Sequence, residues 1–296
     1  MVTSLRRLSA LILASGLTLT GVTACHPPGE SGGGSNTVTI GTTDSSKTAW
    51  TVFRQEAEKE GIHLDVQDFS DYNTPNTALS EGVLDVNLFQ HIKFLASYNV
   101  ESNSDLVPVG STEIVPLALF YKGHTDINDL KDGTSIAIPN DSTNQGRAIN
   151  LLEAQHLVTL KRTGLLNPTP ADIDQAQSKV SVTPVDAAQT ATAWGEGTPA
   201  VVNNTYLQRA GIDPKTAIAA DDPKADNAKP YINVLATRPE KKNDENIKKL
   251  VKVWHSDAVQ KANAEDTKGT SVSVDLPTNQ LEDILKDTEK KTREES

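Results

Sequence analysis

Short apolar runs alternate with amphipathic segments along most of this chain, and that alternation constrains its fold more than any single motif does. Apolar runs predict strands over 37–43, 62–69, 83–89, 106–111, 115–121, 135–140, 199–204 and 231–238. Apolar residues at helical spacing predict helices over about 50–60, 74–82, 143–155 and 245–259, and a charged amphipathic helix from Leu281. Strands that alternate with helices indicate an α/β protein with mostly parallel sheets.

Polar side chains gather where several of these predicted strands end. The clusters lie at 42–46, 71–76, 89–94, 140–147 and 203–204. Ligands of α/β sheets bind beyond the carboxyl ends of strands. We therefore expect one cleft to which several strand ends contribute.

The first residues have the features of an export signal. Arg6 and Arg7 precede "LSALILASGLTLTG", an apolar run too short to span a bilayer as a helix. The run leads into "VTAC", which is similar to a bacterial lipobox, where the signal is cut before the cysteine and the sulfur is lipidated. Cys25 is the only cysteine, so it has no partner for an internal disulfide. We expect a signal peptide over 1–24, lipidation of Cys25 and a Gly/Ser/Pro tether over 25–36.

Charge and histidine spacing argue against several classes of function. The formal net charge is −11 and there is no basic stripe, which argues against nucleic-acid binding. The six histidines are scattered singly, so no short metal-binding motif exists. A formal G-x-S-x-G at 29–33 lacks the flanking strand and helix that a hydrolase nucleophile requires. We expect no catalytic residue, no metal and no cofactor, with a metal site or a secreted hydrolase as the weaker alternatives.

Arg147 is the most informative charged residue, because it lies in the first turn of a predicted helix that follows a strand. A helix start favours an anion, and a guanidinium there can add a bidentate pair. The alternatives are a surface arginine or a pair with Asp141. Asn144 is either a ligand contact or only part of the helix cap.

The remaining candidates have equally ordinary alternatives. Asn203 and Asn233 lie at apolar strand runs, where an amide must find partners, either in the core or on a ligand. Phe89 and Phe94 are either core residues or pocket walls, and His91 between them is either structural or functional.

Long segments of the chain resemble signatures of the NlpA/MetQ-type methionine-binding lipoproteins. "DYNTPNTALSEGVLDVNLFQHIKFL" is similar to the first signature, and "LKDGTSIAIPNDSTNQGRAINLLEAQHL" is similar to the second. "AVVNNTYLQRAGI" and "PYINVLATR" resemble the third and fourth, in the family's order. Four features depart from the pattern. "TTDSSKTAW" replaces a Gly-Pro-His-like turn, which leaves the contacts of Ser45, Ser46 and Trp50 open, and Phe94 lacks a hydroxyl group. Val115 precedes a proline where members of the family have an acidic or aromatic residue, and "TATAWGEGTPA" is longer than the usual approach to the third signature.

The resemblance implies a two-lobed periplasmic-binding-protein fold of type II, with the ligand cleft between the lobes. One lobe would comprise 37–116 plus 235–296 and the other 117–234. The implied pocket uses Tyr72, Phe89, His91 and Phe94 around the ligand side chain, Arg147 for its carboxylate, and Asn144, Asn203 and Asn233 as polar contacts.

The resemblance also implies the protein's role. It would be a lipid-anchored protein on the extracytoplasmic face of the cell membrane that delivers L-methionine or a close analogue to the permease of an ABC importer, without catalysis. A methionine-containing dipeptide or another apolar amino acid is the alternative ligand.

Overall fold

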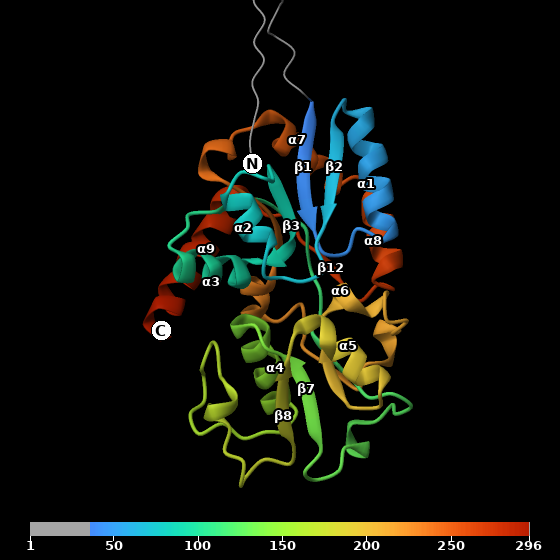
Figure 1. The fold of residues 1–296 in the computed structure, drawn as a ribbon, viewed down its shortest axis with the longest axis vertical. Coiled ribbons are helices and arrows are strands. Elements are labelled where there is room, and N and C mark those ends of the chain that lie inside the picture. The colour runs from blue at the N-terminus through green and yellow to red at the C-terminus, as the bar shows by residue number, and fades with distance from the viewer. Residues whose placement is uncertain (1–35, 296) are drawn as a thin grey trace, which may run out of the picture. The chain divides into compact units, whose positions relative to one another are not determined.

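Residues 36–295 are described by a computed structural model. The predicted signal peptide, Cys25 and all but Asn36 of the predicted tether lie outside the described residues. The described chain forms two main sheets, each covered by helices (Figure 1).

The first sheet has the strand order β2-β1-β3-β11-β4. Its strands are β1 (Thr37–Thr42), β2 (His63–Asp68), β3 (Val86–His91), β4 (Val107–Ser111) and β11 (Asn233–Thr237). β1 runs parallel to β2 and β3, whereas β11 is antiparallel to both β3 and β4. We call this sheet and its covering helices the first lobe. Those helices are α1 (Thr48–Lys59), α2 (Pro75–Ser80), α3 (Ile92–Ser102), α7 (Glu245–Trp254), α8 (Asp257–Asp266) and α9 (Thr278–Glu295).

The second sheet has the order β10-β6-β9-β7-β8 and belongs to the second lobe. Its strands are β6 (Ala118–Phe120), β7 (Ser135–Pro139), β8 (Ser181–Val185), β9 (Ala200–Val202) and β10 (Ala219–Ala220), and its helices are α4 (Ser142–Ala154), α5 (Ala187–Gly195) and α6 (Asn204–Leu207). β5 (Glu113–Ile114) pairs with β12 (Val272–Ser273). Short 3-10 turns are η1 (Ile127–Asp129), η2 (Pro170–Asp172), η3 (Pro214–Thr216), η4 (Asp226–Tyr231) and η5 (Pro239–Lys241).

The central strands of each sheet bury side chains on both faces, because successive side chains point in opposite directions, whereas the edge strands β2 and β8 are more exposed. In β11, Leu235 packs with Trp50, Phe53 and Trp254, whereas its neighbours Val234 and Ala236 pack on the other face. In the second lobe, Leu119 faces α4 while Ala118 and Phe120 face the α5–α6 side. The residues of the candidate site described below lie at strand ends or in the segments that directly follow them.

The α/β class is confirmed, but the sheets are mixed rather than mostly parallel, because β11, β6 and β10 run against their neighbours. α3 was not expected from the sequence. The single helix expected over 245–259 is two helices, α7 and α8, with a break at His255 and Ser256. The expected lobe limits, 37–116 plus 235–296 and 117–234, stay a proposal, and β11 spans the second of those limits.

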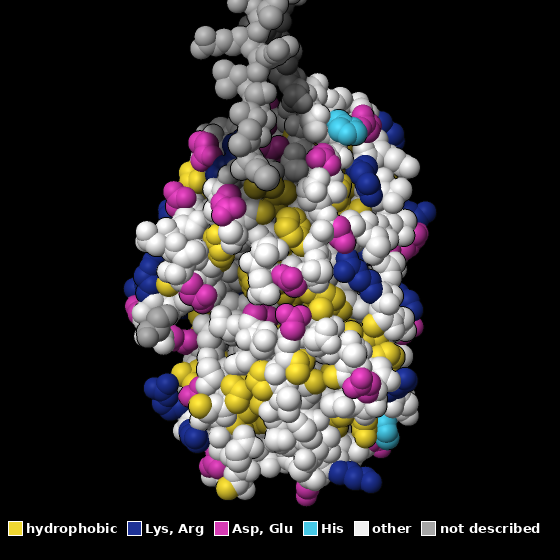
Figure 2. Space-filling model, in the orientation of Figure 1, with side chains coloured by type: hydrophobic (Ala, Val, Ile, Leu, Met, Phe, Trp, Pro, Cys, Tyr) yellow, Lys and Arg dark blue, Asp and Glu magenta, His cyan; other side chains and the backbone are white. Residues whose placement is uncertain are grey.

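The surface of the described chain carries mixed charge. On the face shown in Figure 2, lysine and arginine side chains are interspersed with aspartate and glutamate. Among residues 36–295 no helix has the length and apolar character needed to cross a membrane.

Candidate functional site

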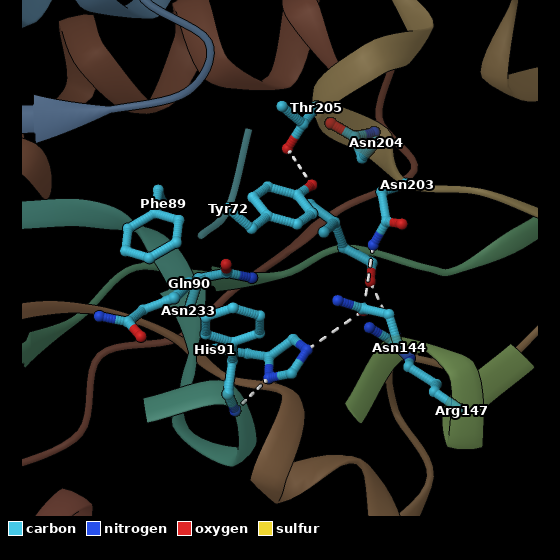
Figure 3. A pocket seen from close by; sticks show the side chains of 12 residues that line it. Tyr72, Phe89, Gln90, His91, Asn144, Arg147, Asn203, Asn204, Thr205 and Asn233 are labelled. Carbon is cyan, nitrogen blue, oxygen red and sulfur yellow. Dashed lines mark hydrogen bonds between the residues drawn. The ribbon is translucent and has the colours of Figure 1, made fainter. Parts of the chain in front are cut away.

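The eight ligand-binding residues expected from the sequence line one cavity, which has an empty volume of about 380 Å³. They come from strand ends and helix starts of both lobes, as the polar clusters predicted (Figure 3). They are Tyr72, Phe89, His91, Phe94, Asn144, Arg147, Asn203 and Asn233. The structure therefore brings the predicted set together, whereas ligand binding by these residues remains a proposal.

Aromatic rings form the apolar side of this cavity. The ring centroids of Phe89 and Phe94 lie 5.8 Å apart, and that of Tyr72 lies 6.1 and 6.0 Å from them. The Tyr72 hydroxyl donates to Thr205 Oγ1 at 2.9 Å, which joins the first lobe to the second. Such an arrangement suits an unbranched apolar or thioether side chain.

Two hydrogen bonds of His91 determine which of its ring nitrogens carries the proton. Its Nδ1 accepts a hydrogen bond from Phe94 N at 3.0 Å, so the imidazole caps the start of α3. Its proton is therefore on Nε2, which lies 3.4 Å from Asn144 Oδ1 in the second lobe (Figure 3). Burial, with the positive charges of Arg147 and Lys93, lowers the pKa of His91 to about 3. His91 is a neutral wall of the cavity and a poor proton acceptor.

Arg147 is buried and already paired, but neither as a surface residue nor with Asp141, which were the two alternatives. Its Nε donates to Asp221 Oδ2 at 2.5 Å, and its Nη2 donates to Asp221 Oδ1 at 3.1 Å and to Val115 O at 2.9 Å. The guanidinium carbon lies 4.1 Å from the Tyr231 ring centroid. These bonds engage Nε and Nη2, and among residues 36–295 Nη1 has no partner. Nη1 is thus available to a carboxylate in the cavity.

The amides of Asn144 and Asn203 form a short chain that ends in an unused acceptor. Asp141 caps α4 by accepting from Asn144 N, and its Oδ1 also accepts from Asn144 Nδ2 at 3.0 Å. Asn203 Nδ2 in turn donates to Asn144 Oδ1 at 3.0 Å. Asn203 Oδ1 is buried and has no partner within the described part of the chain. Asn144 is thus part of the helix cap and of the cavity wall, and an acceptor remains for a cation on a ligand.

Asn233 begins β11 directly beside His91 in the sheet. Its Nδ2 donates to Glu113 O at 3.3 Å, which places the amide between two cavities. Asn233 is thus a wall residue with one donor already engaged.

Four lining residues were not predicted: Gln90, Val115, Asn204 and Thr205. Asn204 belongs to the predicted strand-end cluster 203–204, which was the available signal, and Thr205 follows it directly. The side chains of Gln90 and Asn76 donate to each other, and Asn76 Nδ2 lies 2.7 Å from Gln90 Oε1. These bonds hold the Gln90 side chain in the cavity wall. The side chain of Val115 gives no sign of a role in the cavity. Its position follows from its backbone carbonyl group, which accepts a hydrogen bond from Arg147.

A second cavity, with an empty volume of about 430 Å³, shares Phe89, Val115, Asn204, Thr205 and Asn233 with the first. The segment 42–50, whose contacts were left open, supplies part of its lining through Asp44, Lys47 and Trp50, but neither Ser45 nor Ser46 lines it. The Lys47 ammonium lies 2.7 Å from Asp44 Oδ2 and donates to Asn204 Oδ1 at 3.0 Å. Thr43 Oγ1 and Trp254 Nε1, buried in its lining, have no partner within residues 36–295.

The described residues contain no cluster of three or more histidine, cysteine, aspartate or glutamate side chains positioned to hold a metal ion. The polar groups of the first cavity are a guanidinium, amides, hydroxyl groups and a neutral imidazole, which suit a ligand with separated positive and negative ends.

The chain is similar in sequence and in fold to known proteins. The model of the family described as NlpA lipoprotein matches residues 38–274. The D-methionine-binding lipoprotein MetQ of Salmonella typhi is 36% identical over 208 residues, which are 69% of this chain and 75% of that protein. The substrate-binding protein of a methionine transporter from Streptococcus pneumoniae has a TM-score of 0.74 and 31% identity, covering 81% of this chain and 96% of its own. A nutrient-binding protein from Burkholderia cenocepacia, solved bound to methionine, has a TM-score of 0.73 and 34% identity, covering 80% and 99%.

Proposed function

The chain belongs to the NlpA lipoprotein family, and on that premise we propose that it is a substrate-binding protein that delivers methionine to an ABC importer. The observation that carries the proposal is that one cavity combines an aromatic side with Arg147 Nη1 and Asn203 Oδ1, neither of which has a partner within residues 36–295. We propose no catalytic step for this protein. Its neutral His91 and its hydrogen-bonded amides would bind and orient a ligand rather than transfer protons.

Each part of methionine has a counterpart in this cavity. The thioether side chain lies among Tyr72, Phe89 and Phe94, where sulfur–aromatic contacts contribute about 0.3–1.5 kcal/mol each. The α-carboxylate accepts from Arg147 Nη1, and the α-ammonium donates to Asn203 Oδ1. Burial of a zwitterion without such partners would cost many kcal/mol, so these two contacts decide whether the ligand binds at all.

The ligand binds both lobes at once. Arg147 and Asn203 belong to the second lobe, whereas Phe89 and His91 belong to the first. A ligand that contacts both lobes favours the arrangement in which they close on it. The closed form would then be recognised by the permease of the importer.

We also propose that the mature protein is held at the extracytoplasmic face of the cell membrane by lipid on Cys25. This rests on the lipobox in the sequence and on the lipoprotein names of the relatives, since Cys25 lies outside the described residues. The tether of 25–36 would let the folded body reach the permease.

Calorimetric titration of the ligand-stripped protein tests the proposal. L-Methionine is expected to bind one to one, and D-methionine is the first comparison because relatives carry it in their names. Arg147→Lys retains a charge for Asp221 but loses the Nη1 donors, so its affinity should fall about 100-fold, as expected for two charge-assisted hydrogen bonds. Arg162→Ala, an exposed arginine away from the cavity, should bind as the wild type does. Methionine binding that is equal in both variants would contradict the assignment.

The second cavity is the observation that favours the alternative ligand, a methionine-containing dipeptide. It adjoins the first cavity and is lined by Asp44, Lys47 and Thr43, whose Oγ1 has no partner among the described residues and could bind a polar extension of the ligand. Titration of Gly-Met beside methionine decides between the two. Tighter binding of the dipeptide would make a peptide the proposed ligand. No binding heat with Gly-Met would keep methionine as the proposed ligand.

A further inference from the structure

Arg147 is held by an aspartate that does not itself line the first cavity. Asp221 follows the edge strand β10, and its backbone N–H donates to Leu117 O at 3.1 Å. Its Oδ1 accepts from Leu117 N at 2.9 Å and from Arg147 Nη2, while Oδ2 accepts from Arg147 Nε. The carboxylate is therefore fixed by backbone and guanidinium together, and Nη1 of Arg147 has no partner in the part of the chain that the structure describes.

This pair contributes no net charge to the first cavity, and the two other buried charges behind its wall, Lys93 and Asp141, are opposite in sign and act on each other. Arg147 is the only charged side chain among the residues that line the first cavity, and it is 4% exposed. The other polar groups in that lining are hydroxyl and amide groups and the neutral imidazole of His91. Since Asp221 supplies one negative charge at 2.5–3.1 Å, the guanidinium and its partner sum to zero.

A cavity with no net charge should bind a zwitterion more tightly than an anion with the same side chain. A zwitterion brings its own compensating charge, so its carboxylate can bind Nη1 without leaving an unbalanced charge in the protein. An anion with the same side chain would place an uncompensated negative charge beside a neutral pair. With an unpaired arginine this preference would invert, because the anion would then be the balancing charge.

From this geometry we propose that Asp221 is a specificity-determining residue: it neutralises Arg147 so that the site selects zwitterionic α-amino acids over α-hydroxy acids with the same side chain. The proposal rests on the proposed function and names the ligand class of that same site. Asp221 acts through Arg147 and is a positioning residue rather than a ligand contact.

The alternative is that the pair only stabilises the second lobe. In that case loss of Asp221 would weaken all ligands in parallel. A ratio of two affinities separates the alternatives, because a purely structural defect does not change it.

The test compares L-methionine with its α-hydroxy analogue, 2-hydroxy-4-(methylthio)butanoate, by calorimetry at neutral pH on the ligand-stripped protein. The wild type should bind methionine about tenfold or more tightly than the hydroxy acid. Asp221→Asn should reduce that ratio by about tenfold or more, or reverse it. Asp221→Glu, which keeps the charge, and Asp222→Asn, which removes a charge from the neighbouring position, should keep the wild-type ratio.

Each outcome supports or overturns the proposal. Parallel weakening of both ligands in Asp221→Asn would overturn it, as would a wild type that binds the hydroxy acid as tightly as methionine. If Asp221→Asn does not fold, as judged by circular dichroism, Asp221→Ala replaces it in the same comparison, and an unchanged ratio in that variant would overturn the proposal. A wild type that binds neither compound would instead count against the proposed function.

Discussion

His91 and Lys93 are two residues apart, and both lie buried between the lobes without a carboxylate partner within residues 36–295. The Lys93 ammonium donates to Leu166 O at 2.7 Å and lies 3.5 Å from the Tyr231 hydroxyl. Burial, together with the charge of Arg147, lowers the pKa of Lys93 to about 7. The proton on Lys93 is thus bound far more weakly in the folded chain than in the unfolded one.

This pKa shift gives the protein a pH dependence of defined sign. The folded-state value, about 7, lies below the unfolded value of 10.5, so the unfolded chain binds the extra proton between them. The free energy of unfolding should therefore fall as pH is lowered from 10 towards 7, by up to about 1.4 kcal/mol per pH unit from this residue. Urea unfolding of wild type and Lys93→Met at several pH values measures it. The variant should show a flatter profile, whereas exposed Lys249→Met should follow the wild type.

At the scale of single residues, the sequence predicted most residues that line the first cavity, but it did not predict the hydrogen-bond partner of Arg147. Tyr72, Phe89 and Arg147 were found because motif and strand-end position agree. Asp221, 74 residues from Arg147, carries no local signal, since its role exists only once β10 lies beside β6. Such long-range pairing is a property of topology, which is why the sequence suggested the nearby Asp141 as the partner of Arg147.

Among the secondary-structure elements, α4 approaches the 165–168 loop unusually closely, at Gly146. A Cβ atom added there would lie 2.8 Å from Asn167 Cα, a backbone atom that has no free rotation. Gly146 therefore sets the distance between the helix that carries Arg147 and the loop that accepts from Lys93.

Gly146→Ala should lower the free energy of unfolding by about 1–3 kcal/mol, because overpacking outweighs the better helix propensity of alanine. Gly195→Ala is the matched control: it lies in α5 with no atom within 4 Å of the added methyl, and should raise stability by up to about 1 kcal/mol. Thermal or urea unfolding of the two variants checks the pair. Equal effects of the two substitutions would show that the close approach is not rigid.

Elements with strong local signals were predicted and those without were missed. Trp50, Phe53 and Ala57 mark α1, and Gly61 ends it with φ of 75°. α3 follows β3 with no intervening residue, and its cap is a histidine, which is outside the usual N-cap set. α7 and α8 share one periodicity, and only a short break that includes Ser256, with its extended backbone, separates them.

Across the whole molecule, the lobes are joined by contacts that do not line the first cavity. Arg209 of the second lobe donates to Thr43 O at 2.7 Å and to Asp68 at 3.3 Å. Lys268 of the first lobe lies 2.7 Å from Asp213 of the second. Such contacts form only when the lobes are together, so they add to the stability of the closed form.

Arg209→Ala should weaken methionine binding by about fivefold without altering the cavity, because the closed population falls. The loss should appear mainly as faster dissociation in stopped-flow measurements of tryptophan fluorescence. Arg162→Ala is the control with no contact between the lobes in the described chain. An unchanged dissociation rate in Arg209→Ala would mean that the contact with Thr43 does not hold the lobes together.

The position of β11 has a consequence for biosynthesis. β3 and β4 are joined only through β11 in their sheet, yet residues 112–232 must be synthesised before that strand exists. The second sheet, by contrast, is built from one uninterrupted stretch between Ala118 and Ala220. The second sheet can therefore be completed before the first, and until β11 has been synthesised β3 and β4 each present an open strand edge.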